Sequence, residues 1–113
     1  MILMWAARSL TGRVRSMLAT GLANGDANAT EVAKRLGVST RTLTRRLERD
    51  GTSLKELADD LRRRLALQYV GSRDLPLSEV ALLLGFSQTS AFHRAFRRWT
   101  GQTPLEYRRA RYR

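Results

Sequence analysis

The sequence predicts an all-α fold of about seven helices, in which a helix pair joined by a tight turn occurs twice and a long central helix joins the two copies. Three observations support this prediction. Helix-capping residues and glycine stops recur along the chain, with apolar residues at helical spacing between them. No segment alternates apolar and polar residues for long, as a half-buried strand would. One nine-residue segment also occurs twice, each time ahead of a further amphipathic helix.

The first helix is expected over about residues 2–20, because apolar residues such as Val14 and Leu18 fall near one helical face. A loop is expected at Gly21 and residues 24–26, where glycine, asparagine and aspartate gather.

Capping residues mark the two helices that follow. Asn28, with Glu31 three residues later, predicts a helix start with a capping-box acid, and Gly37 predicts the end of that helix. Ser39 is expected to cap the next helix, which stops near residues 50–51.

The central helix is the longest expected element. Ser53 and Glu56 have the spacing of a capping box and open this helix, which runs to about Val70 before Gly71 closes it. The expected parts of the single domain are residues 1–52, a linker helix over 53–72, and residues 73–113.

Three more helices are expected in the C-terminal part. Pro76 stands where the first of them begins, and Gly85 stands where it ends. Ser87 is expected to start and cap the second helix, which Gly101 closes. A last short helix follows Pro104.

The duplicated segment is the strongest pattern in the chain. Residues 31–39 reappear 48 positions later as residues 79–87, and six of the nine residues are identical. Gly37 and Gly85 fall where the chain needs a left-handed turn that a Cβ atom would penalise. Each copy precedes a helix with buried apolar residues four apart, Leu43 with Leu47 and Phe92 with Phe96. A short helix, a glycine turn and a second helix are typical of the helix-turn-helix motif.

The charge of the chain indicates a polyanionic partner. The formal net charge is +11, and 19 of the 21 basic residues are arginine. Such an excess on a small domain favours nucleic acid as the partner. The central helix, at 18 residues, would be about 27 Å long, near the ~34 Å between successive major-groove faces of DNA.

Composition also excludes several classes of site. The chain has no cysteine and a single histidine, which excludes thiol catalysis, cysteine-bound zinc and a metal site built on histidines, so no metal or cofactor is expected. The apolar residues 1–7 are too few to span a membrane and lack the basic region of a signal peptide. A cytoplasmic protein with no membrane partner is therefore expected.

The chain resembles the DNA-binding domain of AraC/XylS-type transcription regulators over about residues 8–110. The matching stretches are Leu36-Gly37-Val38-Ser39 and residues 42–47 in the first unit, Gly51-Thr52-Ser53, Arg62-Arg63 and Leu65-Ala66 in the spacer, and Leu84-Gly85-Phe86-Ser87, residues 90–99 and Gly101-Gln102-Thr103-Pro104 in the second unit.

The resemblance implies two homeodomain-like helix-turn-helix subdomains bridged by the central helix, in a bacterial, sequence-specific regulator of transcription. It also implies a double-stranded DNA partner and, for many members, contact with RNA polymerase. Most members carry a separate effector-binding or dimerisation domain, so this chain is expected to be the DNA-binding part of a longer regulator.

Residues opposite the expected core faces are the candidate DNA contacts. In the first unit the resemblance assigns base reading to Arg41, Thr44 and Arg45. Either arginine could bind guanine O6 and N7 with its two-pronged side chain. The alternative is that one of them contacts phosphate alone.

In the second unit one extra residue precedes the apolar pair. The resemblance assigns base reading there to Thr89, Ser90, His93 and Arg94. Two alternatives stay open: Arg94 could serve a structural or phosphate contact, and His93 could have no role in binding. The residues expected to contact phosphate are Ser39, Arg46, Arg49, Gln88, Arg97 and Arg98.

Two other groups are expected to be structural. Residues 62–64, three consecutive arginines, are expected to form a solvated face of the central helix, paired in part with Asp59 and Asp60. The aromatic residues of the second unit are expected in the core, because they fall on the helical face opposite the arginines; they are Phe86, Phe92, Phe96 and Trp99.

The sequence therefore predicts a sequence-specific DNA-binding regulator without enzymatic activity. The main alternative is a non-specific architectural protein, which would share the charge but would not need paired helices. An enzyme such as a DNA-repair alkyl transferase is a third alternative, but the chain has no cysteine, the usual nucleophile of such an enzyme, and no carboxylate cluster replaces it. A basic amphipathic membrane binder would have no use for the two glycine turns.

Overall fold

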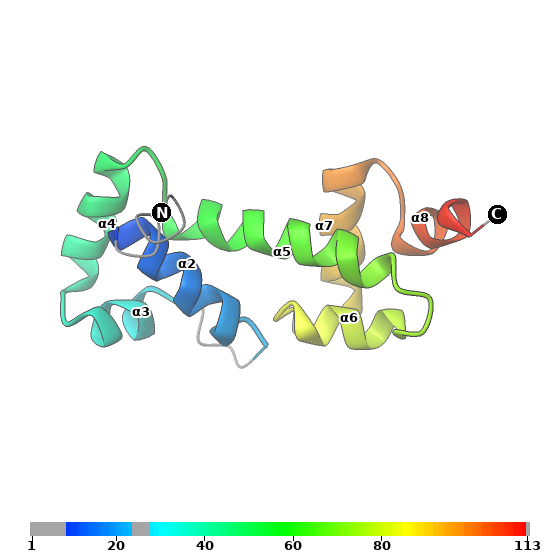
Figure 1. The fold of residues 1–113 in the computed structure, drawn as a ribbon, viewed down its shortest axis with the longest axis horizontal. Helices are drawn as coiled ribbons and strands as arrows, with labels where there is room; N and C mark the ends of the chain where they lie inside the picture. Colours follow the sequence, from blue (N-terminus) through cyan, green and yellow to red (C-terminus); the bar gives the residue numbers. More distant parts are fainter. Residues whose placement is uncertain (1–8, 24–27, 113) are drawn as a thin grey trace. The chain divides into compact units, whose positions relative to one another are not determined.

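The computed structural model describes residues 9–23 and 28–112, and this part of the chain is all-α, as predicted (Figure 1). It contains seven helices within those ranges, also as predicted. In chain order they are α2 (Leu10–Gly21), α3 (Ala29–Leu36), α4 (Thr40–Arg49), α5 (Leu54–Val70), α6 (Leu77–Leu83), α7 (Thr89–Thr100) and α8 (Pro104–Arg111). Among the described residues, none of these helices has the length and apolar character needed to cross a membrane.

The chain forms two compact units, Met1–Leu61 and Arg62–Arg113, and the boundary falls inside α5. The first half of α5 supplies side chains to the core of the first unit, and its second half supplies side chains to the core of the second. Residues 53–72, predicted as a linker helix, thus belong partly to each core.

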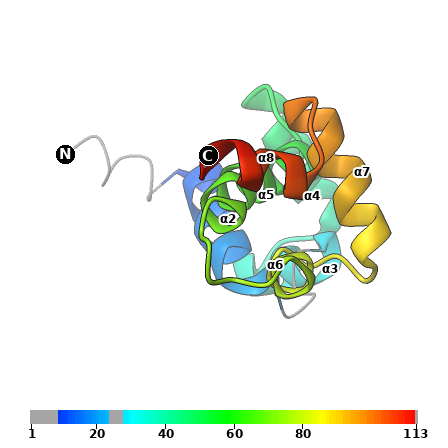
Figure 2. The same cartoon turned by 90° about the vertical axis from the view of Figure 1, so that its right-hand side faces the viewer.

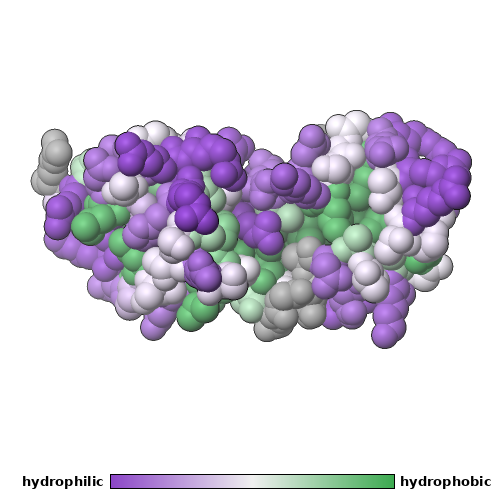
Figure 3. Space-filling model, turned by 180° about the vertical axis from the view of Figure 1, so that it is seen from behind, coloured by the Kyte–Doolittle hydropathy of each residue, from purple (hydrophilic) through white to green (hydrophobic). Residues whose placement is uncertain are grey.

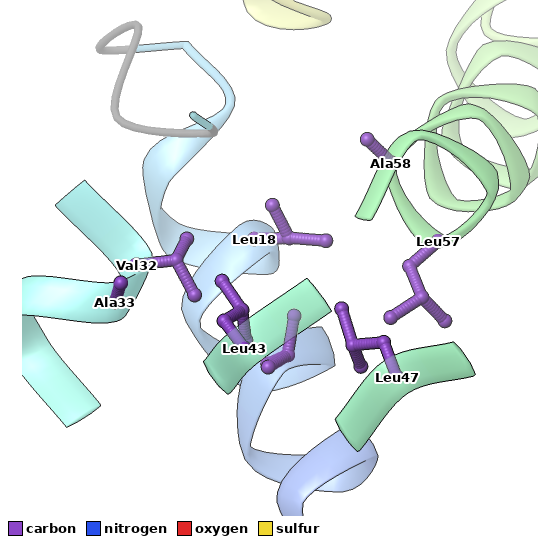
Figure 4. Close-up of a cluster of buried hydrophobic side chains, with 8 residues drawn as sticks. Leu18, Val32, Ala33, Leu43, Leu47, Leu57 and Ala58 are labelled. Carbon is purple, nitrogen blue, oxygen red and sulfur yellow. The ribbon is translucent and has the colours of Figure 1, made fainter. Parts of the chain in front are cut away.

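The core of the first unit draws on four helices (Figure 4). Leucines of α2, α4 and α5 converge on two small residues of α3, and Ala33 leaves room for α4 to pass close by. Burial of each such leucine stabilises the fold by about 1.5–3 kcal/mol. The labelled members, all at most 4% exposed, are Leu18, Val32, Ala33, Leu43, Leu47, Leu57 and Ala58.

The core of the second unit combines aromatic and aliphatic side chains. Phe92 and Phe96 of α7 are fully buried, with ring centroids 5.9 Å apart in an edge-to-face arrangement. The Phe96 ring also meets Tyr107 of α8 at 5.5 Å. Ala66 and Val70 of α5 also belong to this core. The predicted core positions are confirmed for Phe92 and Phe96, whereas Phe86 and Trp99 are partly buried and pack against this core.

Both predicted glycine turns are present and have the same hydrogen bonds. Gly37 and Gly85 have φ values of 71° and 84°, in the left-handed region that favours glycine. The amide of the following residue donates to the carbonyl of an alanine five residues earlier, from Val38 to Ala33 and from Phe86 to Ala81, each at 3.0 Å. This is the Schellman arrangement, which satisfies carbonyls that the helix end leaves unpaired. Figures 1 and 2 show that α7 runs across α6 after its turn, rather than alongside it.

Most of the predicted caps are confirmed. Asn28 Oδ1 accepts a hydrogen bond from the Glu31 amide at 2.8 Å, and Ser39 Oγ accepts from Thr42 at 3.0 Å. Ser53 Oγ accepts from the Glu56 amide at 3.1 Å, whereas Glu56 Oε2 accepts from the Thr52 hydroxyl at 3.3 Å in place of the reciprocal bond of the predicted capping box. A complete capping box, with both reciprocal bonds, is formed by Thr103 and Glu106 at the start of α8.

Two predicted helix starts are wrong. Ser9 is extended, and its Oγ accepts from the Gly12 amide at 2.9 Å, so the helix predicted from residue 2 begins instead at Leu10. Residues 2–8 and 24–26 lie outside the described residues, and Gly21, which was predicted in the loop, is instead the last residue of α2. The second error is at α7, which begins after Gln88 and not at Ser87. The extra residue in the second copy displaces Ser87 from the capping position.

The prediction that residues 62–64 form a solvated face is wrong for one of the three. Arg63 and Arg64 are exposed, but Arg62 is half-buried and its Nε donates to the Leu84 carbonyl oxygen at 3.1 Å. Arg108 of α8 has a similar role, donating to the Val70 carbonyl at 2.9 Å. Both arginines satisfy carbonyls at helix C-terminal ends, where a cation is also favoured by the helix dipole.

Candidate nucleic-acid interface

Helix α4 presents one apolar face to the core and arginines on the other. Leu43 and Leu47 are 1% exposed. At roughly 100° per residue, Arg41 and Arg45 point away from that buried pair. Arg41, Thr44 and Arg45, the predicted base-reading residues of the first unit, are all exposed. The geometry of α4 thus leaves these three side chains accessible to a ligand.

The predicted phosphate contacts of the first unit lie on the same helix or at its start. Arg46 and Arg49 are exposed and, with Thr42 and Arg45, line an open hollow of about 210 Å³ on α4. Three guanidinium groups around one hollow make it suited to an anion such as a phosphate. Thr42 was not predicted as a site residue, although it precedes these three arginines by three, four and seven residues, the spacing of one helix face.

Ser39 is exposed, but its hydroxyl group is already used by the cap. Its Oγ accepts from the Thr42 amide and donates to the Thr42 hydroxyl oxygen, each at 3.0 Å. A phosphate contact by this side chain would have to replace or share one of these bonds.

Helix α7 repeats the arrangement of α4 with different chemistry. Thr89, Ser90 and Arg94 are exposed, and the Ser90 hydroxyl donates to the Gln88 side-chain oxygen at 3.5 Å. His93 is half-buried, with its ring edge-to-face against Phe92 at 5.8 Å. The four predicted base-reading residues therefore lie on one helix, but packing restricts His93 more than the others.

The apolar pairs of the two helices align them residue by residue. Leu43 and Leu47 correspond to Phe92 and Phe96, an offset of 49 residues. The same offset relates the exposed positions, pairing Arg41 with Ser90, Thr44 with His93, and Arg45 with Arg94. Only the last pair is identical in charge and shape. Two helices of the same geometry would thus present different donor sets to a groove.

The predicted phosphate contacts of the second unit lie at the two ends of α7. Gln88 is the N-cap residue, and its side chain makes no capping hydrogen bond to the first turn. Backbone amides at a helix start favour an anion. Arg97 and Arg98 are exposed in the last turn, with the Arg98 guanidinium 6.0 Å from the Trp99 ring.

The exposed surface of both units is rich in charged residues. Hydrophilic residues, coloured purple, make up much of the surface in view in Figure 3. Among residues 9–23 and 28–112, no group of three or more acidic, histidine or cysteine residues could hold a metal ion. What the arrangement offers chemically is a set of cationic and hydroxyl donors on two helices.

Comparison with known proteins agrees with this geometry. Residues 32–110 match the family model described as a helix-turn-helix domain. Over 80 residues the chain is 51% identical to the ornithine utilization regulator of Pseudomonas aeruginosa, covering 71% of this chain and 24% of that protein. Over 100 residues it is 39% identical to the HTH-type transcriptional regulator VirS of Mycobacterium tuberculosis, covering 88% of this chain and 29% of VirS. The chain thus spans about a quarter of the length of the curated relatives it matches.

Solved structures give the same result for the fold. The C-terminal domain of AraT, a response regulator from Geobacillus stearothermophilus, is similar with a TM-score of 0.81 and 29% identity, over 90% of this chain and 85% of that one. A DNA-binding transcriptional dual regulator from Escherichia coli K-12 is similar with a TM-score of 0.74 and 27% identity, over 88% of this chain and 92% of that one.

Proposed function

The chain belongs to the AraC-type helix-turn-helix family of transcription regulators, and from that premise we propose that it binds double-stranded DNA sequence-specifically through α4 and α7. Each helix would enter a major groove with the face opposite its buried apolar pair. The observation that carries the proposal is the repeated turn: both copies hold an exposed arginine-bearing helix behind a left-handed glycine with the same hydrogen bonds.

In the first unit, Arg41 and Arg45 would read bases. They lie four residues apart on the exposed face of α4, so both can reach into one groove. A guanidinium group donates two parallel hydrogen bonds to guanine O6 and N7, which is worth about 1–3 kcal/mol of discrimination. Thr44 would contribute a hydroxyl or methyl contact beside them.

In the second unit, Arg94 would take the place of Arg45, and Ser90 and His93 the places of Arg41 and Thr44. Thr89 would contact the groove from the first turn of α7. With one arginine in place of two, α7 would recognise fewer guanines than α4. The half-site of α7 would therefore differ in sequence from that of α4.

Phosphate contacts would fix the register of each helix on the duplex. Arg46 and Arg49 would hold phosphate oxygens from the hollow of α4. Arg97, Arg98 and the first amides of α7, beside Gln88, would do the same in the second unit. Ser39 would contribute only by sharing its capping hydroxyl.

The experiment that tests the proposal is selection of bound sites from a random pool of DNA, using the full 113-residue chain. We expect a defined site with guanines in the part assigned to α4, and an affinity at least ~10³-fold above that for random DNA. Equal affinity for all sequences would instead identify a non-specific architectural protein.

The cellular role extends this proposal. We propose that the protein acts in the cytoplasm, on promoter DNA, without enzymatic activity of its own. Contact with RNA polymerase and with an effector-binding or dimerisation domain, both implied by the family, also stay proposals.

A further inference from the structure

Arg62 contacts both sides of the turn that leads into α7. Its Nε donates to the Leu84 carbonyl oxygen at 3.1 Å, and its guanidinium carbon lies 5.8 Å from the centre of the Phe86 ring. Gly85, between these two residues, is the left-handed glycine of the turn. One half-buried side chain of α5 therefore contacts the residue before this glycine and the residue after it.

The chemistry of both contacts suits arginine. Leu84 is the C-cap residue of α6, and carbonyls at a helix end lack partners within the helix. The helix dipole favours a cation there, and the aromatic ring of Phe86 favours one as well. A planar guanidinium can donate from its edge while its flat face lies near a ring, which an ammonium group cannot do.

The contacts continue from the turn into α7. The Phe86 ring lies 5.8 Å from Phe92 in the first turn of α7 and 6.4 Å from Trp99 in its last turn. In the sequence of α7, His93 and Arg94, which face the DNA in the proposed function, fall between these two aromatic residues. A displacement of Phe86 would therefore be transmitted to the helix that carries both.

The first unit has an apolar residue at the corresponding position. With the 48-residue offset of the repeat, Leu18 corresponds to Ala66 and Leu22 to Val70, and all four are buried. The same offset pairs Arg62 with Val14, which is fully buried. The first unit thus fills this position by apolar packing, whereas the second unit uses a cation.

We propose that Arg62 is a positioning residue for DNA recognition by the second unit. By holding Leu84 and Phe86 together, it fixes the turn in the conformation from which α7 presents its base-reading face. The inference rests on the proposed function, because it assigns Arg62 to α7 and leaves recognition by α4 independent of it. Arg62 itself would contact no base.

The test compares base preference in the two parts of the selected site. Arg45→Ala and Arg94→Ala first show which bases depend on α4 and which on α7. Two variants are then measured on single-base variants of that site. Arg62→Met removes the charge and keeps a long apolar side chain, and Arg62→Lys keeps the charge without the planar guanidinium group. Arg64→Met, on the exposed side of α5, is the control that loses the same charge.

For Arg62→Met we expect the affinity ratio between the preferred base and its substitutes to fall roughly tenfold at the positions read by α7, comparable to the loss of one base contact. The same ratio should stay unchanged at the positions read by α4. Arg62→Lys should lose less, and Arg64→Met should keep both. Circular dichroism at the assay temperature establishes that each variant is folded. If Arg62→Met does not fold, Arg62→Lys decides by the same criteria.

The outcomes separate the inference from the proposed function. A wild-type chain without any sequence preference overturns both. A wild-type chain with a defined site, together with folded Arg62 variants that keep all base preferences, overturns the inference alone. Equal loss of discrimination in both parts of the site also overturns it, because Arg62 would then act on binding in general.

Discussion

Replacement of Gly37 by alanine tests whether the repeated glycine sets the turn between α3 and α4. Gly37 has a φ of 71°, and a Cβ atom added there would meet nothing within 4 Å. The cost of the substitution is therefore conformational and not steric. An L-residue in the left-handed region costs roughly 1–2 kcal/mol, and the stiffer unfolded chain returns about 0.4–1 kcal/mol of this.

We therefore expect Gly37→Ala to lower the free energy of unfolding by about 1 kcal/mol, or roughly 4–8 °C in Tm. Gly37→Asn should cost less, because asparagine enters the left-handed region more readily than alanine does. Denaturant and thermal unfolding followed by circular dichroism measure both variants. A neutral Gly37→Ala, or a Gly37→Asn that is no better than Gly37→Ala, would refute the assignment of the cost to backbone conformation.

Three further predictions follow from the core, the caps and the charge. Leu47→Ala should lower the free energy of unfolding by about 2–5 kcal/mol, because this side chain is 1% exposed in a core formed by four helices. Urea unfolding measures this loss, and a smaller value would mean that neighbouring side chains fill the cavity. Hydrogen bonds from the amide and the hydroxyl of Thr103 lower the pKa of Glu106, so the capping contribution of this side chain is present above the ordinary pKa of a glutamate and is lost as the pH falls through the lower, folded-state pKa. The unfolding free energies of wild type and Glu106→Gln should therefore converge on acidification, and a difference that grows would contradict the assignment. The affinity for DNA should fall steeply with salt: a plot of the logarithm of the binding constant against the logarithm of the salt concentration should have a slope of roughly −5 to −9 for about 6–10 phosphate contacts. Titration by fluorescence anisotropy measures this slope, and a value near zero would contradict binding through phosphate contacts.

The features that the sequence predicted well are local. Gly37 and Gly85 are read from a few neighbouring residues, because a left-handed turn after a short helix requires glycine whatever packs around it. The exposed positions of Arg41 and Arg45 also follow from local periodicity, since Leu43 and Leu47 fix the opposite face.

The features that the sequence missed depend on packing or on a single competing residue. Three consecutive arginines point in directions about 100° apart around α5, and only the fold decides that Arg62 faces Leu84. Ser9 interrupts a pattern that periodicity alone reads as one helix, because its hydroxyl caps the amide of Gly12. The half-burial of His93 likewise depends on Phe92 beside it.

Footprinting, together with base-preference profiles of Arg45→Ala and Arg94→Ala, decides whether α4 and α7 each read a different part of one DNA site. We expect each variant to relax preference at its own bases only, by about 1–3 kcal/mol, with the two sets of bases separated along one duplex. Relaxation of the same bases by both variants, or an equal loss of affinity for every sequence, would show that the two helices do not read separate parts of the site.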